Sequence, residues 1–237
     1  MAGQLSGTPV LILKEGTSRT RGKSAQQNNI MAGIVISDAV KSTLGPRGMD
    51  KMLVDSLGDV TITNDGASIL KEIDVQHPAA KMLVEVAKSQ DQETGDGTTT
   101  SVVMAGELLK RAQDLLDKKI HPTILVSGYQ KAAEKATKIL KEISVSMEGM
   151  DKKILTGIAS TSMNSKSVSA SKDHFAKIAV DAVLQVAETV NGVTKADIDM
   201  IEIIKKQGKS LTEPELITGM VIAKQTLLAP QPWHAES

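Results

Sequence analysis

Residues 95–118 read Gly95-Asp96-Gly97-Thr98-Thr99-Thr100 and continue as SVVMAGELLKRAQDLLDK. From residue 98 onward, apolar side chains return every three or four positions, which predicts an amphipathic helix over 98–118. The glycines in front of this helix permit a tight turn, because they lack the Cβ that restricts other residues. This stretch therefore predicts a sharp loop that leads directly into a long helix.

The same helical periodicity extends on both sides of this stretch. Gly45-Pro46 is expected to end the first helix, and Pro122 suits the first turn of another. The predicted helices span residues 19–44, 79–92, 98–118 and 122–143, and two more lie within 151–191, joined by the polar stretch 161–172.

Short strands are predicted between and after the helices. Residues 51–55 and 60–64 are rich in β-forming residues and flank a four-residue turn, which predicts a hairpin. Asn64-Asp65-Gly66 is expected to turn the chain again, and residues 200–204 and 216–222 are interpreted as strands. The predicted fold class is mostly α with small β elements, α+β.

Composition narrows the possible functions. Phe, Trp and Tyr make up 1% of the 237 residues, so the core is expected to consist of Val, Ile, Leu, Met and Ala. The 28 basic residues balance the 28 acidic ones, and such a chain has no overall positive field to attract nucleic acid. The absence of cysteine excludes disulfides and thiolate chemistry. With no long apolar segment, the chain is expected to be cytoplasmic, with neither a nucleic-acid nor a membrane partner.

The loop at 95–100 has the residues of a phosphate site. Free N–H groups at the start of a helix bind anions, and glycines let a ligand approach the backbone closely. A carboxylate such as Asp96 would repel phosphate unless a cation lay between them, which suggests a magnesium ligand. The alternative is that Asp96 or Thr98 only caps the helix, and these residues alone leave both interpretations open.

A second glycine-rich turn lies at residues 43–51 and could contact a base or ribose. Taken alone, it favours the ordinary end of a helix. A third candidate, Gly22-Lys23-Ser24, resembles part of a P-loop, but that motif needs four residues between its first Gly and the Gly-Lys pair. Position 17 is Thr, and Gly16 leaves five residues, so the P-loop hypothesis is rejected on spacing.

Five motifs occur together in one order. They are Thr-Leu-Gly-Pro-Arg-Gly-Met-Asp-Lys at 43–51, Ile-Thr-Asn-Asp-Gly at 62–66, His-Pro-Ala-Ala-Lys at 77–81, the 95–100 loop, and Asn-Ser-Lys at 164–166. In this order and spacing the chain resembles group II chaperonins, specifically the archaeal thermosome subunit, from its amino terminus to about Lys224. Residues from Gln225 onward contain two prolines and the single Trp, and do not follow the motif pattern.

The resemblance implies a domain arrangement. Residues 1–145 would form most of an equatorial ATP-binding domain, residues 146–216 the first half of an intermediate domain, and residues 217–237 the start of an apical domain with a divergent tail. Members of the family are longer than this chain, so a chain shortened in the apical domain is expected to expose apolar surface where the other segments pack.

The resemblance also implies roles for individual residues. Leu44, Gly45 and Pro46 would line the nucleotide, Asp96 would bind Mg²⁺, and the phosphates would lie against Gly95, Gly97, Thr98, Thr99 and Thr100. Asn164, Ser165 and Lys166 would sense the γ-phosphate, although without the resemblance Lys166 would be taken for a solvated lysine. Asp65 would orient the attacking water beside a second aspartate that lies outside these residues; the alternative is an Asp-Gly turn.

The implied function is that of a molecular chaperone subunit. It would bind and hydrolyse Mg-ATP to drive the folding of unfolded proteins, in a double ring built with identical or different chaperonin subunits. The alternative is a nucleotide-binding fragment or ring-interaction module without its own folding activity. ATP hydrolysis by these 237 residues stays open, because the second aspartate is not among them.

Overall fold

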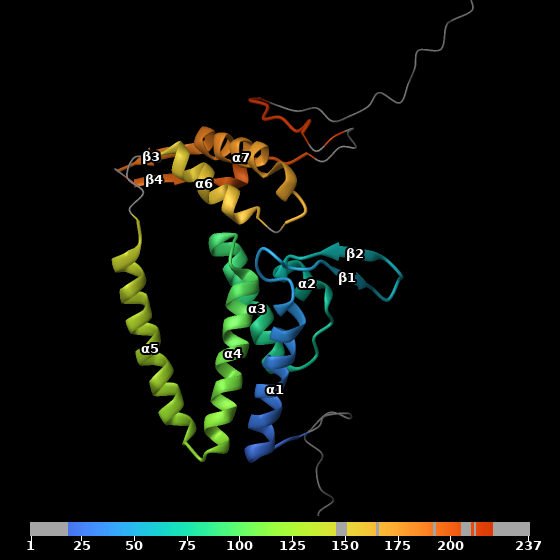
Figure 1. Cartoon of the computed structure of the whole chain (residues 1–237), viewed down its shortest axis with the longest axis vertical. Coiled ribbons are helices and arrows are strands. Elements are labelled where there is room, and N and C mark those ends of the chain that lie inside the picture. Colours follow the sequence, from blue (N-terminus) through green and yellow to red (C-terminus); the bar gives the residue numbers. More distant parts are fainter. Residues whose placement is uncertain are drawn as a thin grey trace, which may run out of the picture. The chain divides into compact units, whose positions relative to one another are not determined.

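The computed structural model describes residues 19–145, 151–164, 166–191, 193–204, 210 and 212–219. The chain divides into two compact units, Met1–Ser146 and Met147–Ser237, which are described separately. The first unit contains α1 (Gly22–Lys41), β1 (Lys51–Val54), β2 (Val60–Thr63), α2 (Gly66–Glu72), α3 (Pro78–Thr94), α4 (Thr98–Asp117) and α5 (Pro122–Ile143) (Figure 1). The mostly helical fold with small β elements is confirmed.

Helices α1 and α4 pack against each other in antiparallel directions. Near the start of α1, Lys23 Nζ lies 3.7 Å from a carboxylate oxygen of Asp117, at the end of α4. Further along, the Ser37 hydroxyl donates to the backbone oxygen of Val103 at 3.5 Å. The end of α1 and the start of α4 therefore lie at the same end of the helix pair, which brings the two glycine-rich turns to one side of the unit.

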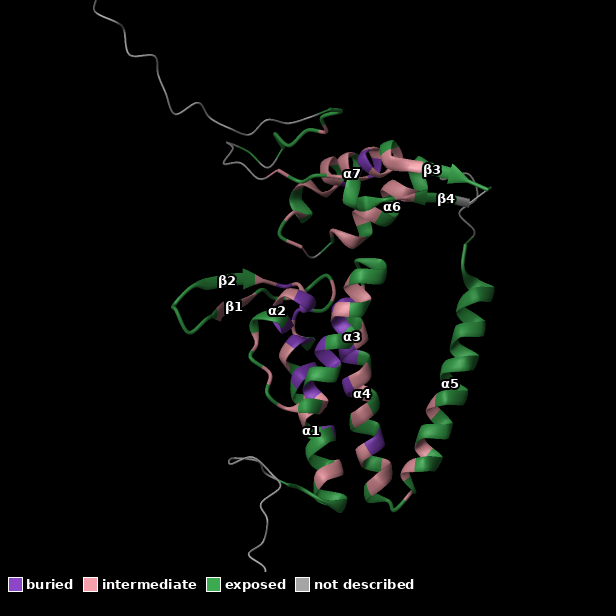
Figure 2. Ribbon diagram, turned by 180° about the vertical axis from the view of Figure 1, so that it is seen from behind, coloured by how far each residue is buried: buried purple, intermediate pink, exposed green. Residues whose placement is uncertain are grey.

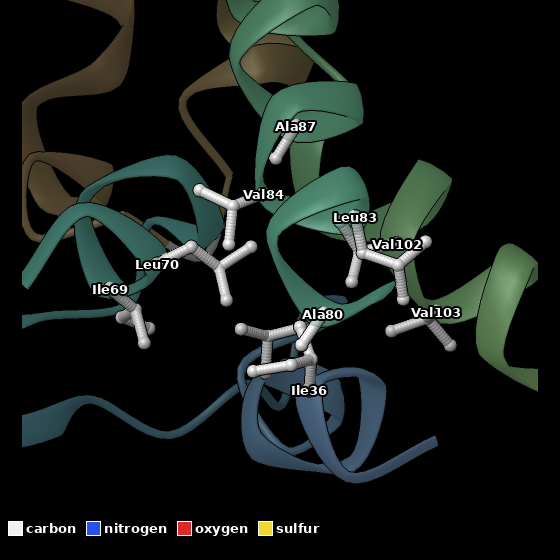
Figure 3. Packing of buried hydrophobic residues seen from close by; sticks show 10 residues of the cluster. Ile36, Ile69, Leu70, Ala80, Leu83, Val84, Ala87, Val102 and Val103 are labelled. Carbon is white, nitrogen blue, oxygen red and sulfur yellow. The ribbon is translucent and has the colours of Figure 1, made fainter. Parts of the chain in front are cut away.

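Helices α1 to α4 enclose the core of the first unit, and Figure 3 shows how their side chains meet. The cluster consists of Ile36, Val40, Ile69, Leu70, Ala80, Leu83, Val84, Ala87, Val102 and Val103. Each fully buried Val, Ile or Leu contributes about 1.5–3 kcal/mol relative to an exposed position. The predicted aliphatic core is confirmed except for methionine. Met31, Met82 and Met104 are all at least 50% exposed.

The hairpin β1–β2 is confirmed, with each strand one residue shorter than predicted. The strands pair antiparallel, with Lys51 opposite Thr63 and Val54 opposite Val60. An Asp55 carboxylate oxygen accepts hydrogen bonds from the backbone N–H groups of Leu57 and Asp59, both at 2.8 Å, which holds the turn. The exposed apolar side chains of the β1–β2 hairpin are Met52, Val54, Leu57, Val60 and Ile62.

Helix α5 has the predicted bounds and begins with Pro122 after a His121 cap. Its sequence is amphipathic, yet in this fully described helix no residue is buried (Figure 2). Tyr129 links it to α4 by donating from its hydroxyl to the backbone oxygen of Leu108 at 2.7 Å. An apolar stripe on a helix normally packs against other parts of a protein. Helix α5 therefore presents an apolar face on which further polypeptide could pack. The expected exposed apolar surface is present here, at Ile124, Ile139, Leu140 and Ile143.

Two predictions in the first unit needed correction. Helix α1 spans 22–41 rather than 19–44, with Arg21 and Ser42 as its caps. Residues 66–72, which were expected to follow a simple turn, form helix α2 because the Asp65 carboxylate accepts from the Ser68 backbone N–H at 2.9 Å. This bond caps the helix and lets Ile69 and Leu70 enter the core.

The second unit contains α6 (Lys152–Ser162), a short 3-10 helix (Ser169–Ser171), α7 (Lys172–Val186), β3 (Ala187–Val190), β4 (Val193–Ala196) and a 3-10 turn (Ile198–Met200). Helices α6 and α7 are tied by an ion pair between Lys152 and Asp181. The polar connection between them is confirmed.

The prediction of helix through residue 191 was wrong, because α7 ends at Val186 and residues 187–190 pair with 193–196. The missed signal is Asn191-Gly192 between β-branched residues, the typical two-residue hairpin turn, and Asn191 has a φ of 55°. The strands predicted at 200–204 and 216–222 were also wrong within the described residues. Residues 198–200 form the 3-10 turn, and neither 201–204 nor 216–219 forms a strand.

Residues 220–222 lie outside the described part of the chain. Among the helices that are described, none is long and apolar enough to span a bilayer.

Candidate functional site

The loop between α3 and α4 consists of Asp96 between two glycines, Gly95 and Gly97, whose backbones adopt the left-handed conformation. Gly95 ends α3 with φ 67°, and its N–H donates to the Asp91 backbone oxygen at 2.9 Å. Gly97 begins α4 as its N-cap with φ 76°. Residues with a Cβ rarely adopt these angles, so glycine at both positions allows α3 to stop and α4 to start within three residues.

Asp96 lies between these glycines and is exposed. One of its carboxylate oxygens accepts from the Gly97 backbone N–H at 2.7 Å. Its backbone oxygen accepts from the side-chain amide of Gln90 at 2.9 Å and from the Thr94 hydroxyl at 3.0 Å. The carboxylate is thus presented on a loop whose backbone is held from the α3 side.

The start of α4 offers backbone donors to an anion. The Ser101 N–H donates to the Gly97 oxygen at 2.9 Å. By helix geometry the N–H groups of Thr98, Thr99 and Thr100, which precede it, have no partner within the helix, and they lie at the positive end of the helix dipole. The side chains of Thr98 and Thr99 are buried, whereas Thr100 is exposed. Backbone groups, with the exposed Thr100 side chain, are therefore the groups available to a phosphate.

Helix α2 begins against the start of α4. Asp65 caps α2, and one of its carboxylate oxygens accepts from both the N–H and the hydroxyl of Ser68, at 2.9 and 3.0 Å. The following residue, Gly66, is packed so closely that an added Cβ would lie 2.4 Å from Thr99 Oγ1 and 3.0 Å from Thr99 Cα. The starts of two helices, and the carboxylate of Asp65, are thus brought to one place.

The turn after α1 is compact and lies at the same end of the unit. Gly45 has φ 85° and its backbone oxygen accepts from the Gly48 N–H at 2.9 Å. A Cβ on Gly48 would lie 2.2 Å from the Thr43 backbone oxygen, so only glycine fits there. The Leu44 side chain is 42% exposed and Pro46 is exposed too. An apolar side chain and a proline ring suit contact with a flat base.

The residues present fit a magnesium ion that is shared with a phosphate ligand. Among the described residues, no group of three or more His, Cys, Asp or Glu could hold a metal by itself. Mg²⁺ commonly binds proteins through one or two carboxylates and completes its shell with waters and substrate phosphates. Asp96, exposed beside the anion-binding start of α4, is suited to that arrangement.

The remaining candidates belong to other elements. Asn164 and Lys166 follow α6 in the second unit; the Asn164 side-chain oxygen accepts from Lys172 Nζ at 2.9 Å, and Lys166 is partly buried. Ser165 lies outside the described residues. Lys23, the residue of the rejected P-loop, pairs with Asp117 at the opposite end of the α1–α4 pair from the 95–97 loop.

Sequence reasoning missed four residues that shape this site: Gly66, Ser68, Gln90 and Thr94. Asp65 carries a weak signal, since an Asp immediately before an apolar periodicity is a typical helix cap. Gln90 and Thr94 have no such signal, because both look like ordinary polar positions near the end of a helix.

Comparison with known proteins places the chain in a family. A model of the TCP-1/cpn60 chaperonin family matches residues 36–236. The chain belongs to this family. Among chaperonins, it is 58% identical over 233 residues to the thermosome subunit beta of Archaeoglobus fulgidus, covering 98% of this chain and 43% of that protein. The alpha subunit of the same organism is 57% identical over 94% of this chain and 41% of its own length. Thermosome subunit beta of Thermococcus kodakarensis is 54% identical, over 98% of this chain and 43% of its own length.

The chaperonin match also changes one expectation. It continues to residue 236, so the resemblance does not stop near Lys224 as the motifs suggested. The chain spans less than half the length of these curated chaperonin relatives.

Proposed function

We propose that this chaperonin chain binds ATP together with Mg²⁺ where the starts of α2 and α4 converge. One observation carries the proposal. Gly66 of α2 packs directly against Thr99 of α4, beside the Asp96 loop. The start of α4 supplies backbone donors for a polyanion, and the adjacent Asp96 carboxylate supplies a ligand for its counter-cation. The match to thermosome subunits supports ATP as that polyanion.

Each part of the nucleotide has a proposed contact. The phosphates lie against the loop at Gly95 and Gly97 and the N–H groups of Thr98, Thr99 and Thr100. Asp96 holds the Mg²⁺, which when bound neutralises phosphate charge. Leu44, Gly45 and Pro46 line the base and ribose. The antiparallel packing of α1 and α4 supports this, because the turn after α1 then lies at the same end of the helix pair as the start of α4.

Hydrolysis is assigned to a water oriented by Asp65. In phosphoryl transfer the protein mainly positions the nucleophile and stabilises charge, so a carboxylate at the phosphate end is the group required. The capping bonds from Ser68 fix Asp65 at the start of α2, which supports a positioned rather than a mobile carboxylate. Its partner in turnover would be a second aspartate from the remaining length of the protein.

The second unit would report on the nucleotide. We assign residues 1–145 to an equatorial domain, 146–216 to part of an intermediate domain and 217–237 to the beginning of an apical domain. Asn164, Ser165 and Lys166 would approach the γ-phosphate, where the lysine ammonium acts as a point charge that is released after hydrolysis.

The whole protein is proposed to be a ring-forming chaperone that acts on unfolded proteins in the cytoplasm. The names of the thermosome subunits that it resembles support assembly with other subunits. The apolar side chains exposed on β1–β2 and on α5 also support it, since such surface normally packs against other chain.

Calorimetry of nucleotide binding tests the site. The wild-type chain is expected to bind ATP with Mg²⁺ and to bind it more weakly with EDTA. Asp96→Asn keeps the side-chain size but removes the charge, and should abolish the difference between the two conditions. Asp114→Asn, on the exposed part of α4, is the matched control and should bind like wild type. Unchanged Mg²⁺ dependence in Asp96→Asn would refute the assignment.

Sedimentation tests the assembly part separately. Mixing the chain with a full-length thermosome subunit should give a species larger than either component. If the chain sediments alone at every concentration, ring assembly is wrong for these residues, whatever the nucleotide result.

A further inference from the structure

We propose that Gln90 and Thr94 are positioning residues, which hold the Gly95-Asp96-Gly97 loop in the conformation that presents Asp96 and the start of α4 to a ligand. This inference deepens the proposed function and rests on it for the identity of the ligand. Its own claim concerns the shape of the loop, which can be measured without any ligand.

The hydrogen bonds converge on one backbone atom. The Gln90 side-chain amide has two protons; one is donated to the Asp96 backbone oxygen at 2.9 Å, and the other to Thr94 Oγ1 at 2.7 Å. The Thr94 hydroxyl has a single proton, shared between the backbone oxygens of Asp96 and Gln90, both at 3.0 Å. The Asp96 carbonyl is therefore held by Gln90 and, part of the time, by Thr94 as well.

This carbonyl needs to be held because of its neighbours. Gly95 and Gly97, on either side, can adopt many backbone conformations at little cost. Rotation of the peptide that joins residues 96 and 97 would turn the Asp96 oxygen and the Gly97 N–H together, since the peptide is planar. The Gly97 N–H is the donor to the Asp96 carboxylate at 2.7 Å. Fixing the carbonyl thus also fixes the carboxylate and the Gly97 N–H at the cap of α4.

The supporting side is anchored in the core. Ala87, one turn before Gln90 on α3, is fully buried in the core. Lys71 Nζ of α2 lies 3.8 Å from a carboxylate oxygen of Asp91, which connects this end of α3 to the helix that Asp65 caps. An added Cβ on Gly97 would be 3.4 Å from the Gln90 amide nitrogen, so the amide fills the space under the loop.

Gln90→Met and Thr94→Val are the decisive variants, because each removes the polar group and keeps nearly the same volume. Thr94→Ser restores the hydroxyl and should restore wild-type behaviour. Gln92→Met makes the same change as Gln90→Met at an exposed position of α3 that takes no part in these bonds. Backbone hydrogen exchange of the chain without ligand and calorimetry with Mg-ATP are measured for all of them.

Gln90→Met should raise the exchange rates of the hydrogen-bonded amides of Gly97 and Ser101 about tenfold, with exchange further along α4 unchanged. The affinity for Mg-ATP should fall about three- to tenfold, the effect of losing one or two hydrogen bonds. ATP affinity measured in EDTA should change less, since the carboxylate then has no cation to hold.

The two hypotheses fail in different ways. If exchange at Gly97 and Ser101 in Gln90→Met equals that of wild type and Gln92→Met, the positioning role is wrong. If exchange rises as expected but wild type does not bind Mg-ATP, the positioning role holds and the nucleotide assignment is wrong. A uniform rise of exchange along α3 and α4 would show that Gln90 only stabilises the fold, and would also overturn the positioning role.

Discussion

Gly66 and Thr99 are in close contact: a Cβ added at Gly66 would lie 2.4 Å from Thr99 Oγ1 and 3.0 Å from Thr99 Cα. Gly66→Ala is therefore expected to push the starts of α2 and α4 apart. The backbone of Thr99 cannot rotate away as a flexible side chain could, so the free energy of unfolding should fall by about 1–3 kcal/mol. Urea denaturation followed by circular dichroism measures this change.

Gly128→Ala is the control for that variant. It makes the same chemical change inside helix α5, where nothing lies within 4 Å of the added Cβ. Alanine has the higher helix propensity, so Gly128→Ala should be neutral or stabilising by up to about 1 kcal/mol. Equal effects of the two substitutions would contradict the close packing at Gly66.

A second close contact, between Gly106 of α4 and Ser37 of α1, can be tested by a double-mutant cycle. A Cβ on Gly106 would lie 2.1 Å from Ser37 Cβ, so Gly106→Ala should destabilise the chain by about 1–3 kcal/mol. Ser37→Gly makes room for the methyl group but weakens α1 by up to about 1 kcal/mol. The double variant should be more stable than the sum of the single losses predicts. Simple additivity would show that the two helices do not meet at these residues.

The ion pair between Lys41 and Glu107 should make stability depend on pH. A hydrogen bond to Lys41 Nζ at 2.5 Å, and the charge of Lys41, lower the pKa of Glu107. The same bond and charge raise the pKa of Lys41. The Glu107 contribution is present above its ordinary pKa of 4.5 and is lost as the pH falls through the lowered value. The Lys41 contribution is present below 10.5 and is lost as the pH rises through the raised value.

Glu107→Gln should therefore destabilise the chain at pH 7 but not at pH 2, as measured by urea denaturation at each pH. Both side chains are largely exposed, so the difference at pH 7 should be small and should shrink in 1 M salt. A difference that persists at pH 2 would assign the effect to packing instead.

Asp65 has a capping role and a proposed catalytic role, and Asp65→Asn separates them. Asparagine caps helices about as well as aspartate, so the free energy of unfolding should change by less than about 0.5 kcal/mol. The uncharged amide cannot accept a proton or orient water as a carboxylate does, so ATP turnover in an assembled ring should fall at least about 100-fold. Retained turnover would remove Asp65 from the reaction.

Several elements were predictable because their signals are local. Helix α4 follows from the periodicity of residues 98–118, and α5 from Pro122 and the apolar stripe behind it. The hairpin β1–β2 follows from two β-rich segments around a short turn. By contrast, α2 was missed, since its seven residues are too few for a clear period and its stability depends on the Asp65 cap and on burial of Ile69 and Leu70.

Residue types at short spacing were enough to predict most of the helices, the glycine turns and the roles of the acidic residues at 65 and 96. The order of five motifs between 43 and 166 indicated the family. The contact of Gly66 with Thr99, and the bonds by which Gln90 and Thr94 hold the Asp96 carbonyl, come from the three-dimensional packing. Such contacts depend on how the helices cross and where each helix ends. A shift of one residue turns a helix by about 100° and would point these groups elsewhere.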